Sequence, residues 1–348
     1  MSVYVDIKKK MGDFQLEVSF SADTEVFALL GASGCGKSMT LKCIAGIEQP
    51  DSGIIKINDR VVYDSQKGIH VPARERRCGY LFQDYALFPN MTVYENINCI
   101  AKDKEETKRL IQRFYLTGKE KLYPGQLSGG QKQRAALARM LAFKPDIIMF
   151  DEPFSALDSY IKWQLEKELS AVIREYNKTV LYVSHDRDEV YRLTDRISVM
   201  EEGRILEIKE KAEFFERPET LAAALLTGCK NFSRVETVEN NVYRAVDWNI
   251  RITVPEDKFN PKAKYIGYRA HYFELADSMQ ENVLECDVVS VVEDMFSYIL
   301  TLKECSVSEK EDWSYIRYEL SKESYKKVSG RNKLWIKIVP DKLIVLEK

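Results

Sequence analysis

The sequence predicts an α/β domain built on a parallel sheet, followed by a smaller, mostly β domain. A glycine-rich stretch, "GASGCGKS" at residues 31–38, separates an apolar strand from a helical pattern. Two unbroken apolar runs, at residues 146–150 and 179–184, flank a helical pattern at residues 159–176, which is typical of a βαβ unit. After residue 231, short apolar runs at hairpin spacing replace the helical signals.

The first residues of the chain predict the start of the α/β domain. Strands are expected at residues 3–9, 16–20 and 26–30. A helix should then start at Lys37 and end at Gly46, because glycine is a common helix terminator. These elements place the glycine-rich stretch between a buried strand and a helix.

The domain boundaries follow from later changes of pattern. Residues 93–142 are rich in helical patterns with a charged face, which indicates a helical insertion in the α/β domain. We therefore expect a first domain at residues 1–228, with a helical subdomain at about residues 85–145. The second domain, residues 229–348, should be a mostly β domain or a barrel.

The composition excludes several classes of protein. Lys and Arg number 52 and Asp and Glu 54, so no strong field of one sign favours nucleic-acid binding. Apolar runs are far shorter than the roughly 20 residues of a spanning helix, and the first residues lack the apolar core of a signal peptide. The seven cysteines are scattered without a CxxC pair, as expected for reduced, buried thiols.

The glycine-rich stretch fits the pattern GxxxxGK[ST] in its required strand–loop–helix context. Glycines let the backbone approach phosphates closely, and the helix start adds N–H donors. Lys37 is expected to reach the terminal phosphates, and the Ser38 hydroxyl to bind Mg²⁺. The predicted phosphate cradle comprises Gly31, Ala32, Ser33, Gly34, Cys35, Gly36, Lys37, Ser38 and Met39.

Two carboxylates end the apolar run "DIIMF", where α/β sheets place their ligands. Asp151 is expected to hold the Mg²⁺ shell, and Glu152 to polarise a water as general base. Taken alone, the pattern also fits a pair of carboxylates at a strand end that are solvated or cap a helix.

A second glycine-rich helix start, "LSGGQ", leaves two interpretations open. Ser128 and Gln131 match an S-x-x-Q capping box, so the stretch could merely begin a helix. Alternatively, Ser128, Gly129, Gly130 and Gln131 contact a phosphate bound to a second subunit, because the helical insertion carries them away from Lys37. This second interpretation predicts a homodimer with two nucleotides at its interface.

Five ordered motifs, "GASGCGKS", "LSGGQKQR", "DIIMFDEP", "SALD" and "SHD", resemble those of the ATP-binding subunits of ABC transporters. The resemblance covers residues 1–228. It implies an α/β P-loop ATPase with a RecA-like core, an antiparallel β subdomain and a helical subdomain. ATP and Mg²⁺ are the implied cofactors.

The resemblance also implies roles for individual residues. Gln83 would link Mg²⁺ to a membrane partner, and His185, which follows an apolar strand, would contact the γ-phosphate. Asp158 would lie at the dimer interface. Phe14 would stack on adenine, with Met11 as the alternative.

Further implications concern partners and substrate. The protein would dock on membrane permease subunits beside residues 84–97, at the cytoplasmic face of the plasma membrane, and receive substrate from an extracytoplasmic binding protein. The C-terminal region resembles the OB/TOBE-like domain of importer ATPases for oxyanions and sugars. The segments at residues 226–231 and 64–89 resemble the molybdate-type ATPases most. The C-terminal region departs from its family at Ala270, where that family has proline. Sulfate, tungstate, iron and sugars are alternative substrates, and a soluble ABC ATPase without a transport role is the alternative class.

Overall fold

The computed structural model describes residues 2–154, 159–305 and 312–347 of the chain. These residues form two compact units, Met1–Lys211 and Ala212–Lys348. Asp158, the predicted dimer-interface residue, lies outside the described residues. Within the described ranges, no helix is both long and apolar enough to cross a bilayer.

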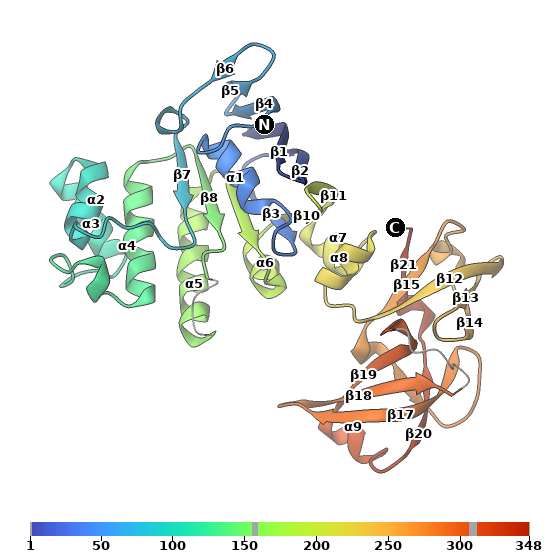
Figure 1. Ribbon diagram of the computed structural model, residues 1–348. Coiled ribbons are helices and arrows are strands. Elements are labelled where there is room, and N and C mark those ends of the chain that lie inside the picture. The colour runs from blue at the N-terminus through green and yellow to red at the C-terminus, as the bar shows by residue number, and fades with distance from the viewer. Residues whose placement is uncertain (1, 155–158, 306–311, 348) are drawn as a thin grey trace. The chain divides into compact units, whose positions relative to one another are not determined.

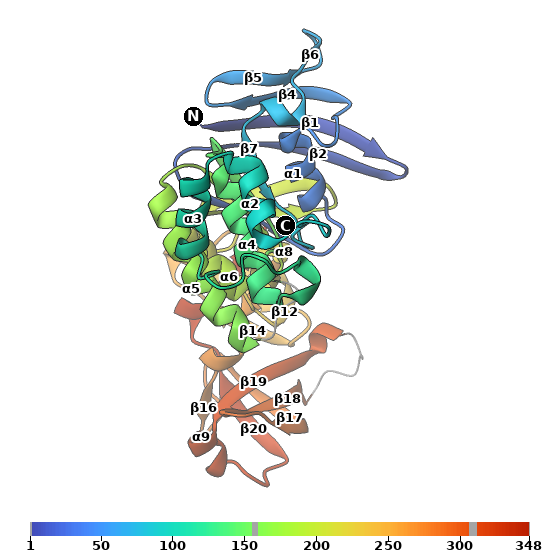
Figure 2. The same ribbon diagram turned by 90° about the vertical axis from the view of Figure 1, so that its left-hand side faces the viewer.

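The first unit is built on one mixed sheet, whose order within the described residues is β6-β5-β4-β1-β2-β11-β10-β3-β9-β8-β7. Strands β10, β3, β9, β8 and β7 form its parallel part. The remaining early strands form the antiparallel arm at the top of Figure 2. The bounds are β1 (Val3–Met11), β2 (Phe14–Ala22), β3 (Val26–Gly31), β4 (Ser52–Ile57), β5 (Arg60–Asp64), β6 (Ile69–His70), β7 (Cys78–Leu81), β8 (Ile147–Asp151), β9 (Val180–Ser184), β10 (Arg196–Glu201) and β11 (Arg204–Glu210).

The helices confirm the predicted α/β organisation. Their bounds are α1 (Lys37–Ala45), α2 (Val93–Ala101), α3 (Lys104–Arg113), α4 (Gly129–Ala142), α5 (Ser159–Tyr176) and α6 (Arg187–Leu193). Helix α1 ends at Gly46 in the left-handed conformation, and α5 has the predicted bounds. Helices α2, α3 and α4 lie together beside β7, where the sequence predicts a helical insertion (Figure 1).

Strands β3, β8 and β9 are buried on both faces, which explains their unbroken apolar runs. Ile147 and Met149 of β8 pack in the core that includes α1, whereas Ile148 and Phe150 pack in the core that includes α4 and α5. Alternate residues of a strand point to opposite faces, so each face has its own core. Both cores therefore hold the carboxyl ends of β8 and β9 in place.

The second unit packs two sheets around one core, which confirms the predicted C-terminal β domain. Their orders within the described residues are β14-β13-β12-β15-β21 and β16-β20-β17-β18-β19. The buried Asn231 joins the two sheets, because its Nδ2 donates to the carbonyls of Tyr268 and Arg317. The bounds are β12 (Asn231–Glu239), β13 (Val242–Ala245), β14 (Ile250–Thr253), β15 (Tyr265–Tyr268), β16 (Glu274–Ala276), β17 (Val283–Glu293), β18 (Ser297–Glu304), β19 (Tyr315–Ser321), α9 (Lys322–Lys326), β20 (Lys333–Lys337) and β21 (Ile344–Leu346).

Two short helices, α7 (Lys211–Glu216) and α8 (Leu221–Leu226), precede the C-terminal strands. Ala224 of α8 packs in a small core with Phe232, Ile344 and Leu346. The second unit therefore starts at Ala212, earlier than the boundary after residue 228 that the sequence pattern suggests. Helical periodicity alone does not show which core a helix covers.

Candidate functional site

The phosphate loop follows β3 and leads into α1. Gly34 and Gly36 have φ of 82° and 106°, in the left-handed region that glycine tolerates best. A Cβ on Gly31 would lie 2.3 Å from the Met200 carbonyl oxygen, so this position also requires glycine. Within the described residues, no side chain caps the start of α1, which leaves its first N–H groups for an anion.

Lys37 is folded back onto its own loop. Its Nζ donates to the carbonyl oxygens of Gly31 and Ala32, at 2.8 Å each, and only 4% of the residue is exposed. These carbonyl dipoles hold the ammonium without neutralising its charge. An incoming phosphate offers anionic acceptors, which make stronger hydrogen bonds to an ammonium than neutral carbonyls do.

Ser38 and Asp151 meet at the carboxyl end of β8. The Ser38 hydroxyl donates to Asp151 Oδ1 at 2.7 Å, and the Tyr80 hydroxyl donates to Asp151 Oδ2 at the same distance. Burial and then the Asp151 charge raise the pKa of Tyr80 far above its usual range, so Tyr80 remains a donor. Hydroxyl and carboxylate oxygens are ligands that Mg²⁺ prefers, so Ser38 and Asp151 fit a magnesium site.

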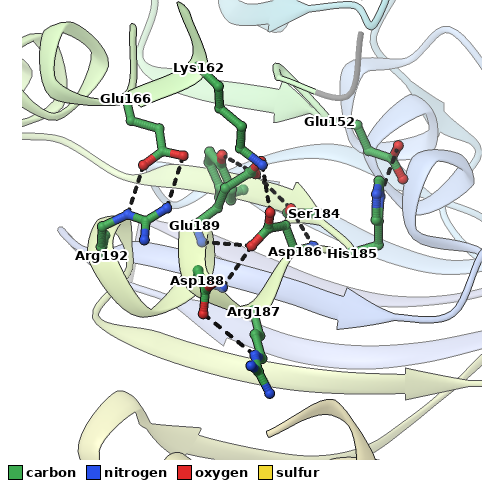
Figure 3. Close-up of polar contacts among 11 residues, drawn as sticks. Glu152, Lys162, Glu166, Ser184, His185, Asp186, Arg187, Asp188, Glu189 and Arg192 are labelled. Atoms are coloured by element: carbon green, nitrogen blue, oxygen red, sulfur yellow. Dashed lines mark hydrogen bonds and ion pairs between the residues drawn. The ribbon is translucent and has the colours of Figure 1, made fainter. Parts of the chain in front are cut away.

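Glu152 and His185 face each other at the ends of two neighbouring parallel strands. His185 Nδ1 lies 3.3 Å from Glu152 Oε2 (Figure 3). Glu152 has a positive φ of 48°, and its N–H donates to the Val183 carbonyl at 3.0 Å. Non-glycine residues in this conformation cluster at functional sites. The structure therefore brings together the predicted base and the predicted histidine.

A buried network of polar side chains connects the end of β9, which precedes His185, to α5 and α6. Glu189 accepts hydrogen bonds from Tyr182 at 2.9 Å and from Ser184 at 2.7 Å, while Lys162 lies 2.6 Å from its other oxygen (Figure 3). Lys162 also bonds to Asp186, which caps α6. The network ties α5 and α6 to the strand that carries His185.

Tyr80, Lys162 and Glu189 were not predicted from the sequence. Tyr80 meets Asp151, 71 residues away, through strand pairing, and Lys162 meets Glu189 through helix packing. The pairing of Tyr80 with Met149 across β7 and β8 is the signal that would have located Tyr80.

The second glycine-rich helix start has the predicted capping box. Ser128 Oγ accepts from the Gln131 N–H at 3.4 Å, and Gln131 Oε1 accepts from the Ser128 N–H at 3.0 Å. Ser128 and Gly129 are exposed at the start of α4. A helix N-terminus carries a partial positive charge, which favours anions near this exposed helix start.

The remaining predicted residues lie around the phosphate loop and the helices. Gln83 is exposed, two residues beyond β7, the strand next to β8. The Phe14 ring lies against the loop, 3.3 Å from where a Cβ on Gly36 would be. Met11 is half-buried at the end of β1, and Met39 is half-buried against the core that includes α1.

The segment at residues 84–97 is partly buried against the helical part of the unit. Tyr85 is buried, and Asn96 Nδ2 donates to the carbonyls of Phe88, Met91 and Thr92. Phe88 is exposed, with the Arg139 guanidinium 4.9 Å from its ring centre. Phe88 is therefore the aromatic side chain of this segment best placed to meet a partner.

A phosphate loop, an acidic strand end and a facing histidine, all at one edge of a parallel sheet, belong to the class of P-loop nucleotide-binding proteins. The sequence profile of the ABC transporter family matches residues 15–155. A solved dimer of the ATP-binding cassette MJ0796, bound to ADP and Pi, is 28% identical, with a TM-score of 0.52 over 61% of this chain and 99% of that one. This likeness confirms the predicted P-loop ATPase fold.

Curated relatives narrow the class. A sulfate/thiosulfate import ATP-binding protein of Synechocystis is 37% identical over 290 residues, which are 79% of this chain and 77% of the relative. A Fe(3+) ions import ATP-binding protein of Haemophilus influenzae is 40% identical over 61% of this chain and 62% of its own length. A molybdenum import ATP-binding protein of Paramagnetospirillum magneticum is 39% identical, over 58% and 57%. The chain thus spans less than two thirds of the iron and molybdenum relatives, and it belongs to the family of ABC transporter ATP-binding subunits of import systems.

Proposed function

We propose that the protein hydrolyses ATP and that this reaction powers an ABC importer. The observation that carries this proposal is the convergence of Lys37, Ser38, Asp151, Glu152 and His185 at one edge of the sheet. The family relationship supports it, because the relatives are import ATP-binding proteins. A soluble ABC ATPase acting away from a membrane is the alternative.

The residues would act in the following order. Lys37 exchanges its carbonyl acceptors for phosphate oxygens, and the N–H groups of the loop hold the other phosphates. Ser38 and Asp151, with Gln83, would hold Mg²⁺, which when bound neutralises phosphate charge and orients the terminal phosphate. Glu152 takes a proton from the attacking water, and His185, beside it, donates to the terminal phosphate.

A homodimer explains the second helix start. Ser128, Gly129, Gly130 and Gln131 of one subunit would contact the terminal phosphate bound by Lys37 of the other, and Asp158 would lie at the same interface. ATP would favour the closed dimer because it contacts both subunits only in that state. The dimeric state of the MJ0796 cassette supports this arrangement.

Closure of the dimer would drive membrane permease subunits at the cytoplasmic face of the plasma membrane. Phe88 and its neighbours at residues 84–97 are the proposed docking segment. An extracytoplasmic binding protein would deliver the substrate to the permease. Phe14, beside Gly36, is the proposed adenine contact, with Met11 as the alternative.

Molybdate is the proposed substrate, because several segments of the chain resemble molybdate-type ATPases. The identities to iron, sulfate and molybdenum relatives are similar, at 37–40%, so they do not rank the substrates. Uptake assays with the cognate permease provide the test. Stimulated uptake of molybdate and tungstate over sulfate is expected, whereas preferential iron or sugar uptake would reassign the substrate.

The hydrolytic step is tested by Glu152→Gln, which keeps the shape of the side chain and removes its basicity. We expect ATP binding to remain, hydrolysis to fall by at least about a hundredfold and an ATP-bound dimer to accumulate. Glu105→Gln, on the exposed face of α3, is the matched control and should hydrolyse ATP normally. Undiminished hydrolysis by Glu152→Gln would reject the assignment of the base.

A further inference from the structure

The histidine of the site gains little orientation from packing around its ring. The His185 side chain is 54% exposed, and its Nδ1 lies 3.3 Å from Glu152 Oε2. A catalytic side chain needs support from the residues around it to keep a productive geometry. For an exposed ring, this support has to come through the backbone that carries it. The residues on either side of His185, Ser184 and Asp186, therefore determine where the ring lies.

Both neighbours of His185 are held by hydrogen bonds. The Ser184 hydroxyl donates to Glu189 Oε2 at 2.7 Å, and it also accepts from the Asp186 N–H at 2.9 Å. Asp186 Oδ1 accepts from the N–H groups of Asp188 and Glu189, at 2.8 and 3.2 Å. The turn that carries His185 is thus fixed on both sides of the histidine.

Lys162 of α5 connects these two anchoring points. Its Nζ lies 2.5 Å from Asp186 Oδ2 and 2.6 Å from Glu189 Oε1 (Figure 3). The Lys162 side chain is 21% exposed and that of Glu189 only 4%. A buried carboxylate is costly unless a cation and hydrogen-bond donors compensate its charge. Lys162 supplies this cation to Glu189.

The two carboxylates keep Lys162 charged. Burial alone would lower the pKa of its ammonium, but the hydrogen bonds to Asp186 and Glu189 outweigh this effect, so the pKa lies above its usual range. Lys162 therefore remains a cation at neutral pH. Asp186 caps α6 and Glu189 lies within it, so this cation joins α5 to both α6 and the turn that carries His185.

A second ion pair joins the same two helices. Arg192 of α6 donates from Nε and Nη2 to the two carboxylate oxygens of Glu166 in α5, at 2.7 and 3.0 Å. Glu166 is buried, as Glu189 is. Within the part of the chain that the structure describes, the Arg192 guanidinium bonds to Glu166 and not to the neighbours of His185 (Figure 3). This pair thus links α5 to α6 without contacting the turn that carries the histidine.

We propose that Lys162 is a positioning residue for His185. It holds Asp186 directly and Ser184 through Glu189, and so fixes both backbone neighbours of the histidine. The role rests on the proposed function, in which Glu152 and His185 act on ATP. A displacement of about 1 Å at a reacting group is enough to slow a reaction about a hundredfold.

The test compares Lys162→Met with Arg192→Met in the full-length chain. Each substitution removes an ion pair between α5 and α6 and leaves a buried carboxylate without its cation, so both should lower the thermal stability. Only Lys162→Met should also lower kcat for ATP hydrolysis, by about tenfold to a hundredfold. KM should change little, because the phosphate loop holds the nucleotide. Lys162→Arg, which retains the charge, should recover most of the lost kcat.

A double variant keeps the test valid if Lys162→Met does not fold. Lys162→Met combined with Glu189→Gln leaves no buried charge without a partner at this position, and the amide oxygen still accepts from Tyr182 and Ser184. We expect this variant to fold and to show the same low kcat. A kcat equal to that of Arg192→Met would overturn the positioning role.

His185→Ala separates this role from the proposed function. Loss of hydrolysis in His185→Ala together with a normal kcat in the Lys162 variants would reject the positioning role alone. Normal hydrolysis in His185→Ala would reject the proposed function of the histidine, and the role of Lys162 with it. The expected result is a low kcat in His185→Ala and in Lys162→Met, with nucleotide binding retained in both when measured by calorimetry.

Discussion

At the scale of single residues, the site contains some side chains that the sequence predicts and others that it does not. Local motif spacing after a strand predicts Lys37, Ser38, Asp151 and Glu152. The Ser38 hydroxyl lies within hydrogen-bond distance of Asp151, as expected. Tyr80 was missed because its role depends on which strand lies beside β8. Sequence spacing determines what a loop presents, but not which side chain the neighbouring strand contributes.

Removal of the Lys37 ammonium should abolish its electrostatic contribution to nucleotide binding. A charge-assisted hydrogen bond contributes about 1.5–3 kcal/mol, so Lys37→Ala should weaken ATP binding about tenfold to a hundredfold. Calorimetry with ATP measures this change. Lys42→Ala, which changes a half-buried lysine later in α1, serves as the control. Equal affinity in the Lys37 variant and the unmodified chain would refute the phosphate-loop assignment.

Gly31→Ala tests the close contact between β3 and β10. The added methyl group would lie 2.3 Å from the Met200 carbonyl oxygen and 2.8 Å from Cys35 Sγ, so backbone must shift. We expect the free energy of unfolding to fall by about 1–3 kcal/mol. Gly125→Ala is the control, since a Cβ there meets no heavy atom within 4 Å. Denaturant unfolding of both variants is the measurement. A loss of stability in Gly31→Ala alone indicates steric overlap, whereas an equal loss in both variants indicates a general effect of alanine.

At the scale of elements, the long helices and buried strands were predictable. The helical pattern predicts a helix at residues 159–176, and α5 spans Ser159–Tyr176. The short strands β4, β5 and β6 were not identified, because they are partly exposed and gain their order from pairing: β4 with β1, β5 with β4 and β6 with β5. Their formation depends on tertiary contacts more than on local pattern.

Ser128 has two possible roles at the start of α4, and a comparison with α2 separates them. Thr92 forms the same capping box with Glu95. Ser128→Ala and Thr92→Ala should each lower the free energy of unfolding by about 0.5–2 kcal/mol through the lost cap. Only Ser128→Ala should also weaken the ATP-bound dimer of the Glu152→Gln background, measured by sedimentation. Equal dimer affinities in the two variants would leave Ser128 a helix cap and nothing more.

Helix α6 should show a pH-dependent stability through Asp186. Burial alone would raise the pKa of this carboxyl, but the hydrogen bond from Lys162 and the N–H of Glu189 outweigh it, so the pKa lies below its usual range. A lowered folded-state pKa stabilises the fold above the unfolded value of about 3.9, and this stabilisation is lost as the pH falls further. The free energies of unfolding of the unmodified chain and of Asp186→Asn should therefore become equal as the pH is lowered. A constant difference between the two free energies down to pH 2 would contradict this.

At the scale of the whole molecule, the sequence predicted two domains but not the helix that belongs to the second. The apolar face of α8 covers the C-terminal strands through Ala224. A chain ending at Lys211 should therefore fold and bind ATP, whereas one ending at Gly228 should expose that face and aggregate. Thermal unfolding and light scattering of the two truncated chains test this. Equal solubility would favour the later boundary.

The hydrogen bonds of Lys37 have a consequence for ligand selection. Its ammonium has two carbonyl acceptors on its own loop. A neutral ligand offers it no improvement, so adenosine would gain contacts only at the base, whereas a polyphosphate offers acceptors that carry full charge. The loop thus selects ligands mainly by their number of negative charges and less by their shape. Nucleoside triphosphates of any base should compete for it, and the choice of adenine is left to the contacts around Phe14.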